Sequence, residues 1–313
     1  MTAKKQTPNG EKPKRTSYST KLNESQIAVL EQICRSKGWL SREVPHAVAA
    51  FTGPDFNVTA YQSGKCLVQG KGTEDFVVHI LEPEVTKEAV YGYDEVLHPE
   101  WYEAHAGLDE SGKGDLFGPL VSAAVSASPE AIREWVDAGI KDSKTISPAG
   151  ILRLEKIIRK TKGSAFHIVA CSMPKYNQLM AKPGANLNKL LAWQHARALE
   201  QVLEKQWVPW GMLDQFSKRP LTQEYFRGKE FDLRMMTKAE ADPVVAAASV
   251  LARAEFVRRL KELEKIAGEP LKKGAGPLVK QQGIELARRI GPERFGEIAK
   301  LHFKTAKEIL ATV

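Results

Sequence analysis

The stretch 107-GLDESGKGDLFGPL-120 combines two adjacent carboxylates, Asp109 and Glu110, with a glycine-rich turn. From Gly107 it matches the first part of a phosphate-binding P-loop, G-x-x-x-x-G-K, but Gly114 stands where that loop needs a Ser or Thr hydroxyl to hold magnesium. The two carboxylates also fall inside the loop, where they would repel a bound triphosphate. The pattern therefore excludes a nucleotide-binding P-loop.

Adjacent acidic residues at the end of an apolar strand are instead typical of a divalent metal site. Mg²⁺ prefers carboxylate oxygens and completes its coordination with water and substrate phosphates. A third carboxylate, Asp214, stands near the end of the apolar run 210-WGMLDQF-216, where a lone charge would be costly to bury. We therefore expect metal-dependent phosphate chemistry.

Two further acidic residues, Glu240 and Asp242, lie in 237-TKAEADPVVAAASVLAR-253, just before or at the first turn of a predicted helix. Acidic residues in this position commonly cap helices, so each of them alone has an ordinary structural explanation. Asp242 directly precedes Pro243, a favourable first helical residue, and so occupies a natural N-cap position. The functional interpretation depends on their combination with the acidic pair of the first stretch.

From residue 106 to the end of the chain, short apolar strands alternate with helices. The predicted strands are 106–111, 119–127, 164–173, 210–216 and 231–236. The predicted helices are 130–138, 148–161, 187–206 and 243–266. The third of these helices places its leucines on one face, so we expect it to pack against the sheet. The pattern predicts an α/β domain.

Residues 22–84 have a different pattern, which predicts a small α+β domain. Asn23 and Gln26 have capping-box spacing, and the apolar residues that follow predict an amphipathic helix from about 24 to 37. The predicted strands are 47–53, 56–62, 65–70 and 75–83, with the second and third joined as a hairpin at Ser63–Gly64. Residues 85–105 lack clear periodicity and are interpreted as a linker.

Much of the positive charge lies at the N-terminus. The net charge is +8, and residues 1–22 supply five of these charges, because they hold six basic side chains and one acidic side chain. The basic residues are Lys4, Lys5, Lys12, Lys14, Arg15 and Lys21. The rest of the chain is almost balanced, so the basic excess is weak evidence for a nucleic-acid partner. We interpret residues 1–21 as a solvated, disordered basic tail.

Composition also limits the class of protein. The chain has 313 residues, 42% of them hydrophobic, and can bury a substantial core. No apolar run approaches the roughly 20 residues that cross a membrane, and no signal peptide is visible, so we expect a soluble cytoplasmic protein. The three cysteines, Cys34, Cys66 and Cys171, have no C-x-x-C spacing and are expected to be reduced and buried.

Six segments together resemble bacterial ribonuclease HIII, a branch of the type 2 ribonuclease H family. They are 107-GLDESGKGDLFGPL-120, 141-KDSKTIS-147, 186-NLNKLLAWQHARALE-200, 211-GMLDQF-216, 237-TKAEADPVVAAASVLAR-253 and 298-IAKLHFK-304. The resemblance implies an RNase H-like catalytic domain, a mixed sheet with flanking helices, over residues 106–313. It also implies a substrate-binding domain similar to TATA-binding protein over residues 22–84. The implied activity is metal-dependent cleavage of the RNA strand of RNA–DNA hybrids, which leaves 5′-phosphomonoesters.

The resemblance also implies the metal ligands. Asp109 and Glu110 match the first two acidic ligands of the family, Asp214 the third and Glu240 the fourth. Two Mg²⁺ ions, for which Mn²⁺ could substitute, would then be bridged by Asp109 and would act on water and the scissile phosphate. The chain is one residue shorter than the family pattern before the AAAS run of 246–249, so Asp242 remains an alternative to Glu240.

The implied substrate contacts lie in two loops. Gly112, Lys113 and Gly114 would meet the ribose 2′-hydroxyl, the group that distinguishes RNA from DNA, because glycine lets the backbone approach the sugar. Ser143 and Lys144 match a second family motif near the substrate, although a hydroxyl and a lysine there could equally cap the next helix.

Other candidates are weaker. His195 and His302 lack the spacing of metal ligands, and we expect structural roles for both. In the small domain, Tyr61, Lys65 and Lys71 could contact nucleic acid. Alternate strand positions point to opposite faces, so the sequence does not show which of them do.

Two other functions remain open. A ribonuclease HII-type enzyme would cut at single ribonucleotides in DNA, but no tyrosine follows Tyr225 to match that branch, which also usually has aspartate where Glu240 stands. A catalytically silent hybrid-binding protein would gain nothing from several carboxylates beside a polyanion. We expect an active enzyme that is a monomer and has RNA–DNA hybrid as its partner.

Overall fold

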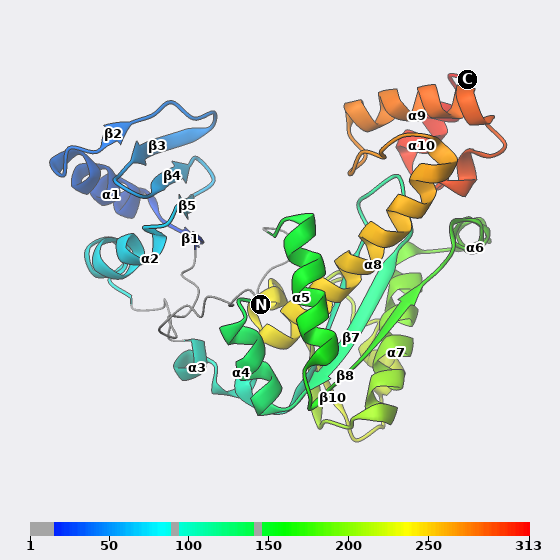
Figure 1. Ribbon diagram of the computed structural model, residues 1–313, viewed down its shortest axis with the longest axis horizontal. Helices are drawn as coiled ribbons and strands as arrows, with labels where there is room; N and C mark the ends of the chain where they lie inside the picture. Colours follow the sequence, from blue (N-terminus) through cyan, green and yellow to red (C-terminus); the bar gives the residue numbers. More distant parts are fainter. Residues whose placement is uncertain (1–15, 89–93, 141–145) are drawn as a thin grey trace, which may run out of the picture. The chain divides into compact units, whose positions relative to one another are not determined.

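The computed structural model describes residues 16–88, 94–140 and 146–313 (Figure 1). The chain divides into two compact units, Met1–Glu100 and Trp101–Val313, and each is described by itself. Within the described ranges, no helix is both long enough and apolar enough to cross a membrane.

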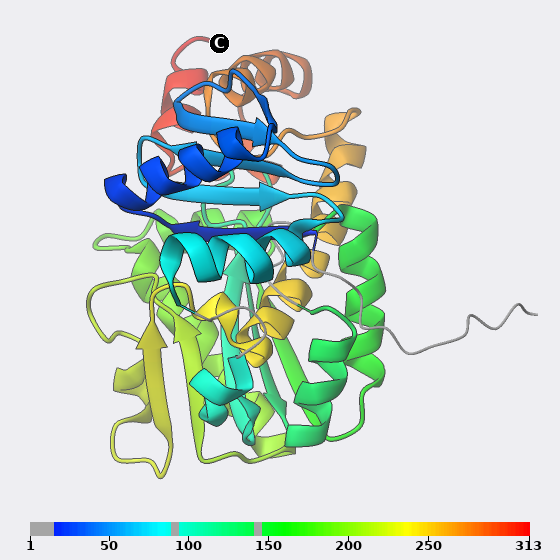
Figure 2. The same ribbon diagram turned by 90° about the vertical axis from the view of Figure 1, so that its left-hand side faces the viewer.

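The N-terminal unit is built on a five-stranded antiparallel sheet with the order β1-β5-β4-β3-β2 (Figure 2). Its strands are β1 (Ser17–Lys21), β2 (Leu40–Ser41), β3 (Ala47–Thr52), β4 (Asn57–Tyr61) and β5 (Lys65–Gln69). The predicted hairpin is present, because β4 pairs with β5 from Asn57↔Gln69 to Ala60↔Cys66. Gly64 in its turn has a φ of +78°, a conformation that glycine adopts without strain.

Helix α1 (Glu24–Ser36) covers one face of this sheet. Its predicted capping box is confirmed: the Asn23 side chain accepts a hydrogen bond from the backbone N–H of Gln26, whose side chain accepts one from the backbone N–H of Asn23. One side of the helix is buried in the core of this unit. The buried residues are Ile27, Leu30 and Cys34.

The prediction of a strand at 75–83 is wrong, because these residues are helical. They form α2 (Thr73–Phe76) and a π-helical segment, η1 (Val77–Thr86). Val77, Leu81 and Val85 are buried and recur every four residues, which is a helical spacing. The valines and isoleucine of this run favour strands locally, but packing of one face against the core decides the structure.

The predicted domain boundaries also differ from the structure. Residues 17–21, placed in the tail by the sequence, form β1 and pair with β5; the remainder of that tail, 1–15, lies outside the described residues. The polar sequence of this edge strand contains no apolar signal. The predicted linker contains α3 (Asp94–Leu97) and η2 (Pro99–Tyr102). Trp101 and Tyr102 are buried in the core of the second unit, so the end of the linker belongs to that unit.

The second unit contains a five-stranded mixed sheet with the order β10-β9-β6-β7-β8. Its strands are β6 (His105–Ser111), β7 (Val121–Ala127), β8 (Ser164–Ala170), β9 (Trp210–Asp214) and β10 (Asp232–Met236). β7 is antiparallel to both β6 and β8, whereas β9 is parallel to β6 and to β10. The predicted α/β class with a mixed sheet is confirmed, and its central strand is β6.

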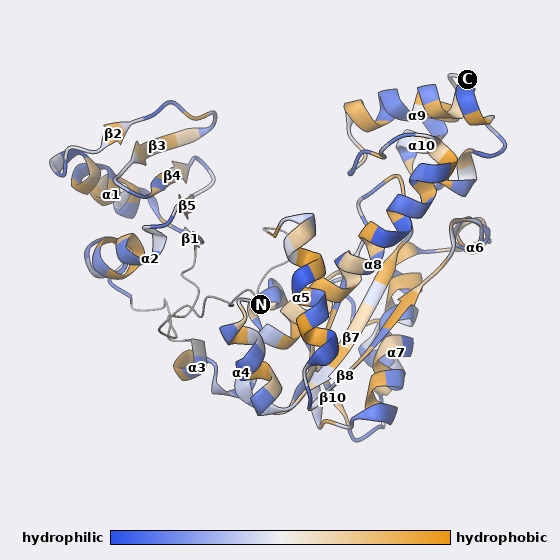
Figure 3. Cartoon of the chain, in the orientation of Figure 1, coloured by the Kyte–Doolittle hydropathy of each residue, from blue (hydrophilic) through white to orange (hydrophobic). Residues whose placement is uncertain are grey.

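Helices cover both faces of this sheet (Figure 1). They are α4 (Pro129–Asp137), α5 (Pro148–Lys160) and α8 (Pro243–Ala267) on one face, and α7 (Leu187–Lys205) on the other. Along β7, Ala123 and Val125 belong to the core with α8, whereas Ala124 between them packs with Leu199 of α7. Figure 3 shows hydrophobic and hydrophilic residues alternating along α5 and α7, as expected for helices with one buried side.

Three helices of this unit were not predicted. They are α6 (Met173–Met180), α9 (Pro277–Ile290) and α10 (Lys304–Leu310). In α9 the apolar pattern is interrupted by Gln282, which is buried because its amide hydrogen-bonds the backbone N–H of Lys272 and the carbonyl of Pro270. The described part of the unit also contains short 3₁₀ turns: η4 (Gln223–Phe226), η5 (Ala239–Ala241) and η6 (Phe295–Glu297).

Candidate active site

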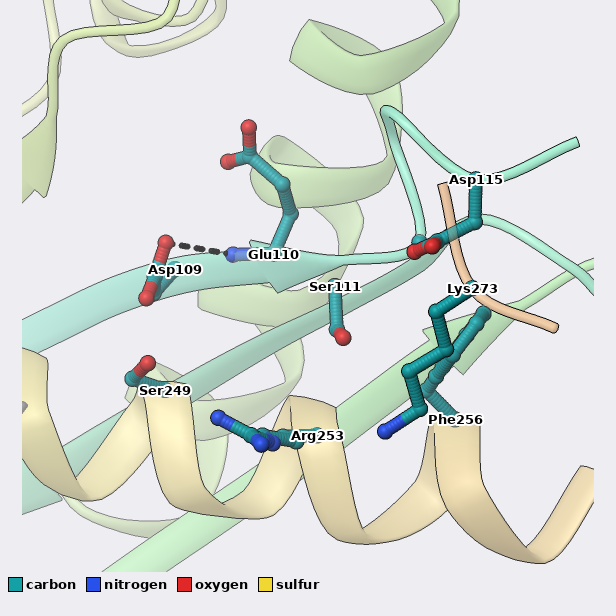
Figure 4. Close-up of a pocket in the computed structure, with 9 residues that line it drawn as sticks. Asp109, Glu110, Ser111, Asp115, Ser249, Arg253, Phe256 and Lys273 are labelled. Carbon is teal, nitrogen blue, oxygen red and sulfur yellow. Dashed lines mark hydrogen bonds between the residues drawn. The ribbon is translucent and has the colours of Figure 1, made fainter. Parts of the chain in front are cut away.

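Asp109 and Glu110 stand near the end of the central strand β6 and point to opposite faces of the sheet (Figure 4). Asp109 faces α8 and is only 7% exposed, and its Oδ1 accepts a hydrogen bond of 2.7 Å from the backbone N–H of Glu110. The hydroxyl of Ser249, on α8, also hydrogen-bonds the Asp109 carboxylate. The strand and the helix therefore both hold this carboxylate.

Asp214 is brought next to Asp109 by the pairing of two strands. β9 runs parallel to β6, and the last pair of their ladder is Leu108↔Leu213, directly before the two aspartates. The Oδ1 atom of Asp214 accepts a hydrogen bond of 3.1 Å from the backbone N–H of Ala239, in the turn that leads into α8. Two acidic residues about 100 positions apart in the sequence thus meet at one edge of the sheet.

The carboxylates crowd each other electrostatically. Burial and then the neighbouring charges of Glu110 and Asp214 raise the pKa of Asp109 to about 8, although the hydrogen bonds from Ser249 and from the backbone N–H of Glu110 oppose the shift. A buried carboxylate among other carboxylates destabilises the folded state unless a cation or a proton compensates it. The site therefore favours binding of a cation.

Asp242 has a structural role, and its predicted position as an N-cap is confirmed. It is fully buried, and its Oδ1 accepts hydrogen bonds from the backbone N–H groups of Val244 and Val245 at the start of α8. Both of its carboxylate oxygens also contact Nε2 of buried His105, at 3.0 and 2.9 Å. These contacts hold the carboxylate at the end of the helix.

Glu240 lies in η5, two residues before this cap. It directly follows Ala239, whose N–H binds Asp214, and the Oε2 atom of Glu240 is buried. The two residues that the sequence left as alternatives thus have different surroundings. Asp242 holds α8, and Glu240 stands in the turn attached to the carboxylate at the end of β9.

His195 was expected to be structural, and it is fully buried in α7, but it also contacts an acidic residue of the site. Its Nε2 lies 3.1 Å from Oε2 of Glu110, and its ring stacks beside that of Phe216 at 5.5 Å. No spacing in the sequence indicates this contact, which joins residues 85 positions apart. His302 contacts the rings of Tyr176 and Phe303.

The glycine-rich loop lies beside Glu110. The Lys113 ammonium is 3.7 Å from Oε1 of Glu110 and donates a hydrogen bond to the carbonyl of Phe216. Gly112 has a φ of +86°, and a Cβ there would lie 2.2 Å from the carbonyl oxygen of Pro119, so only glycine fits. A Cβ on Gly114 would meet no atom within 4 Å, so the backbone there is open to a ligand.

A hollow of about 240 Å³ extends from Asp109 along α8 (Figure 4). Its lining residues are Asp109, Glu110, Ser111, Gly112, Asp115, Ser249, Arg253, Phe256 and Lys273. Sequence reasoning missed Ser249, Arg253 and Lys273. The first two are four residues apart on α8, a spacing that could have indicated a shared helix face. The hollow therefore combines acidic side chains with two cationic ones, Arg253 and Lys273.

Within the described residues, no three His, Cys, Asp or Glu side chains converge as a ready-made metal-binding group. Glu110 illustrates the reason, because His195 and Lys113 hold its carboxylate on the other side of the strand from Asp109. Ser143 and Lys144 lie outside the described residues.

Comparison with known proteins identifies the family. A family model described as Ribonuclease HII matches residues 106–306, and one described as a domain of unknown function (DUF3378) matches residues 18–90. A ribonuclease HIII from Chlamydia trachomatis serovar L2 is 38% identical over 303 residues, which cover 95% of this chain and 98% of that protein. The chain belongs to the ribonuclease HIII family.

Further ribonuclease HIII proteins support this assignment. The protein from Protochlamydia amoebophila is 37% identical over 257 residues, covering 82% of this chain and 84% of its own length. The crystal structure of Bst-RNase HIII in complex with Mn²⁺ matches with a TM-score of 0.62 and 28% identity, covering 95% of this chain and 99% of that one. Aquifex aeolicus RNase H3 matches with a TM-score of 0.55 and 27% identity, covering 92% and 100%.

Membership in the ribonuclease HIII family confirms the enzyme class that the sequence predicts, a ribonuclease H. Ribonucleases H are endonucleases that cut the RNA strand of RNA–DNA hybrids. The HII-type alternative is disfavoured, since the ribonuclease HIII relatives match both units of this chain and not the catalytic unit alone. The relatives are named as ribonucleases, which also disfavours the alternative of a catalytically silent binding protein.

Proposed function

We propose that this ribonuclease H hydrolyses the RNA strand of RNA–DNA hybrids with two divalent metal ions held by four acidic residues. These residues are Asp109, Glu110, Asp214 and Glu240. The observation that carries the proposal is the buried Asp109 carboxylate, whose pKa is raised by its burial and by the neighbouring charges of Glu110 and Asp214. Carboxylate oxygens suit Mg²⁺ and Mn²⁺, and the complex of Bst-RNase HIII with Mn²⁺ supports this choice.

The chain supplies ligands and positioning, and no protein nucleophile. When bound, the metal ions would activate the attacking water and stabilise the charge of the scissile phosphate and of the departing 3′ oxygen. Ser249 orients the Asp109 carboxylate by its hydrogen bond, and His195 and Lys113 orient that of Glu110. Such contacts behind the metal ligands restrict how far the two carboxylates move between turnovers.

The loop of Gly112, Lys113 and Gly114 is proposed to select the ribose 2′-hydroxyl. Gly114 leaves room for the sugar to approach the backbone, whose N–H and C=O groups are the available hydrogen-bonding partners. Ser143 and Lys144 are proposed to contact the substrate as in the family pattern.

Arg253 and Lys273 are proposed to hold a backbone phosphate of the hybrid. Both line the hollow that begins at Asp109, and Figure 4 shows their cationic ends on its α8 side. Arginine and lysine are the side chains that most often pair with nucleic-acid phosphates. A phosphate there would lie beside the acidic residues.

The experiment that tests the proposed function measures cleavage of labelled duplexes with and without Mg²⁺. The duplexes are an RNA–DNA hybrid, DNA with one embedded ribonucleotide, and DNA alone. We expect Mg²⁺-dependent cleavage of the hybrid by the wild type and none by Asp109→Asn, because the amide removes a negative ligand. Hybrid binding by the variant should persist, since it also removes repulsion of the phosphates.

Asp232→Asn is a matched control. It makes the same chemical change at an exposed carboxylate on β10 that pairs with Arg234, and it should keep full activity. The melting temperature of Asp109→Asn in the absence of metal should equal or exceed that of the wild type, because a buried charge is removed. Hydrolysis by Asp109→Asn above a few per cent of wild type would overturn the assignment of the ligand.

The N-terminal unit, predicted to bind substrate, is proposed to do so with the sheet face opposite its core. Val58 and Ala60 of β4, and Cys66 of β5, belong to that core, so strand alternation places Tyr61 and Lys65 on the other face. There they are available for ring stacking and phosphate pairing. Lys71, after β5, is exposed as well.

We also propose that the protein acts as a cytoplasmic monomer. All three cysteines are free, and burial raises the pKa of Cys34 and of Cys66 to about 12, which keeps both thiols protonated and unreactive. Such thiols persist in a reducing compartment. Light scattering coupled to size exclusion would test the monomer, and fractionation of cells would test the location.

A further inference from the structure

Lys300 is a fully buried lysine outside the acidic residues of the site. It lies between η6 and α10, and its ammonium donates hydrogen bonds to the backbone carbonyls of Asp115, at 2.7 Å, and of Gly118. The rings of Tyr176 and Phe303 lie 5.7 and 5.9 Å from the same nitrogen. Lysine is almost never buried completely without such partners. The two carbonyls and the two rings thus compensate the buried ammonium.

The two carbonyls belong to one short segment, residues 115–118, which directly follows the glycine-rich loop. The segment is also bound to the C-terminal part of the chain through its backbone. Gly118 donates to the carbonyl of Ile298, and Lys300 donates through its own N–H to the carbonyl of Leu116. Lys300 therefore hydrogen-bonds the segment both through its backbone N–H and through its side-chain nitrogen.

The two side-chain hydrogen bonds fix the distance between the carbonyl oxygens of Asp115 and Gly118. One nitrogen holds two carbonyls three residues apart, so neither can rotate without losing its bond. Burial lowers the pKa of Lys300 to about 7, but a neutral amine still has two N–H donors for the two carbonyls. Lys300 can therefore keep both hydrogen bonds whether its side chain is charged or neutral.

Stability alone does not explain a charged residue here. Buried ions often stabilise a fold no better than apolar residues of the same size, and they are best explained where they specify one geometry. The geometry in question is the turn from Gly112 to Gly118, both of which have a φ of +86° and so depend on a fixed backbone path. The carboxylate of Asp115 is fixed as well, because its Oδ1 accepts from the N–H of Gly274 at 2.5 Å.

We propose that Lys300 is a positioning residue for ribose selection: by clamping residues 115–118 it holds the backbone of Gly112–Gly114 where the 2′-hydroxyl of the substrate must bind. This role rests on the proposed function, because it requires hybrid cleavage and the contact of the glycine loop with ribose. Lys300 itself touches neither substrate nor metal.

The test is a double-mutant cycle between Lys300→Met and the 2′-hydroxyl. Methionine keeps the length of the side chain and removes its donors. The hybrid carries a short run of ribonucleotides within 2′-O-methyl RNA, so that cleavage is confined to one phosphate, and a matched hybrid has 2′-deoxyribose on the 5′ side of that phosphate. The measurements are kcat and KM on both hybrids for the full-length wild type and variant.

We expect Lys300→Met to reduce the ribose-to-deoxyribose ratio of kcat/KM by about tenfold, the size of one coupled hydrogen-bonding interaction. The loss should appear in kcat on the ribose hybrid, with little change in KM or in the Mg²⁺ concentration for half-maximal rate. A folded variant with a ratio within about twofold of wild type would overturn the proposal.

Asn177→Leu is a control that distinguishes the hydrogen bonds of Lys300 to residues 115–118 from the general stability of residues 296–301. The Asn177 side chain donates to the carbonyls of Gly296 and Ala299 and accepts from the N–H of Leu301, but it does not bind residues 112–118. This variant should lose melting temperature and keep the ribose-to-deoxyribose ratio. An equal change of ratio in Asn177→Leu would show that the effect belongs to the whole segment, and the proposal would fail.

Lys300→Gln is the second variant, in case Lys300→Met does not fold. Its amide keeps donors on a shorter side chain, so an intermediate ratio is expected and a wild-type ratio would contradict the proposal. Failure of this inference differs from failure of the proposed function. In the second case the wild type does not cleave the hybrid, or Asp109→Asn remains active.

Discussion

At the scale of single residues, Glu240 and Asp242 show how two carboxylates in one turn acquire different roles. Asp242 is enclosed by the N-terminal N–H groups of α8 and by His105, all of which stabilise its charge. Glu240 has the longer side chain and follows Ala239, which binds Asp214. A substitution at each position should therefore change a different property.

Glu240→Gln should reduce Mg²⁺-dependent turnover by orders of magnitude with little change in melting temperature, because a charged ligand becomes a neutral isostere. Asp242→Ala should lower the free energy of unfolding by about 2–4 kcal/mol, since it removes a cap and leaves Nε2 of buried His105 without its partner. Thermal melting and initial rates on the hybrid measure both effects. An inactive but stable Asp242→Ala together with an active Glu240→Gln would exchange the two assignments.

Lys300 should make stability depend on pH. Its pKa in the folded state, about 7, is below the ordinary value of 10.5, so between these values the unfolded chain binds more protons and the free energy of unfolding rises with pH. The titratable groups facing Lys300 are Asp115, Tyr176 and His302. Burial raises the pKa of Tyr176, and burial with nearby lysines lowers that of His302, so neither of these two titrates in this window.

The measurement for Lys300 is the melting temperature of the wild type minus that of Lys300→Met. This difference should increase from about pH 7 to about pH 10. The subtraction removes the contribution of other lysines. A difference that does not change across this range would mean that the buried ammonium keeps its ordinary pKa.

The candidate acidic residues could be proposed from the sequence, whereas the buried contacts of His195 and Lys300 could not. Asp109, Glu110 and Asp214 are visible because carboxylates interrupt apolar strands, where an unpaired charge is costly. His195 and Lys300 make contacts across 85 and more than 180 positions, which no local pattern encodes. Their burial is equally invisible, because histidine and lysine are ordinarily exposed or only half-buried.

At the scale of elements, the site depends on how closely β6 approaches α8. A Cβ on Gly107 would lie 2.3 Å from the carbonyl carbon of Val244 and from the nitrogen of Val245, so glycine lets the strand touch the helix backbone. α8 carries Ser249 and Arg253, which line the hollow beside Asp109. The distance between these two elements therefore sets the position of both walls of the site.

Gly107→Ala should destabilise the fold by about 1–3 kcal/mol or more and reduce kcat, because the added methyl group forces α8 away from β6. Gly114→Ala is the matched change for stability: its Cβ meets no atom within 4 Å, so the melting temperature should hold. Cleavage of the hybrid by Gly114→Ala should nevertheless fall, because the methyl group occupies space proposed for ribose. Equal melting temperatures for Gly107→Ala and the wild type would contradict the close approach.

Elements were predictable where one face has a regular period and a clear end. The predicted helix at 187–206 agrees with α7 to within one residue, because the buried leucines along it and the Asn186 cap at its start are both local signals. The run 75–83 was assigned wrongly because its valines favour strands locally, whereas contact with a sheet formed by distant residues makes it helical. The edge strand β1 has no apolar period at all, so only its pairing with β5 defines it.

At the scale of the whole molecule, each of the two units packs its described residues around its own hydrophobic core. The first joins α1 to β3, β4 and β5, and the second surrounds the mixed sheet. The four acidic residues proposed as ligands all lie in the second unit, whereas the basic tail and the open sheet face belong to the first. This division predicts that chemistry and much of the electrostatic attraction for the hybrid can be separated by truncation.

A chain of residues 101–313 keeps Trp101, which is buried in the second core, and should fold and retain a similar turnover at saturating substrate. Its KM should rise, and its binding should depend less on salt, because each lost phosphate contact lowers the slope of log K against log salt by about 0.9. Binding is measured with Asp109→Asn in the full-length chain and in the truncated chain. A third chain, 16–313, lacks only the residues before β1 and so distinguishes the contribution of the tail from that of the N-terminal sheet. Equal slopes for all three chains would contradict a substrate-holding role for the N-terminal unit.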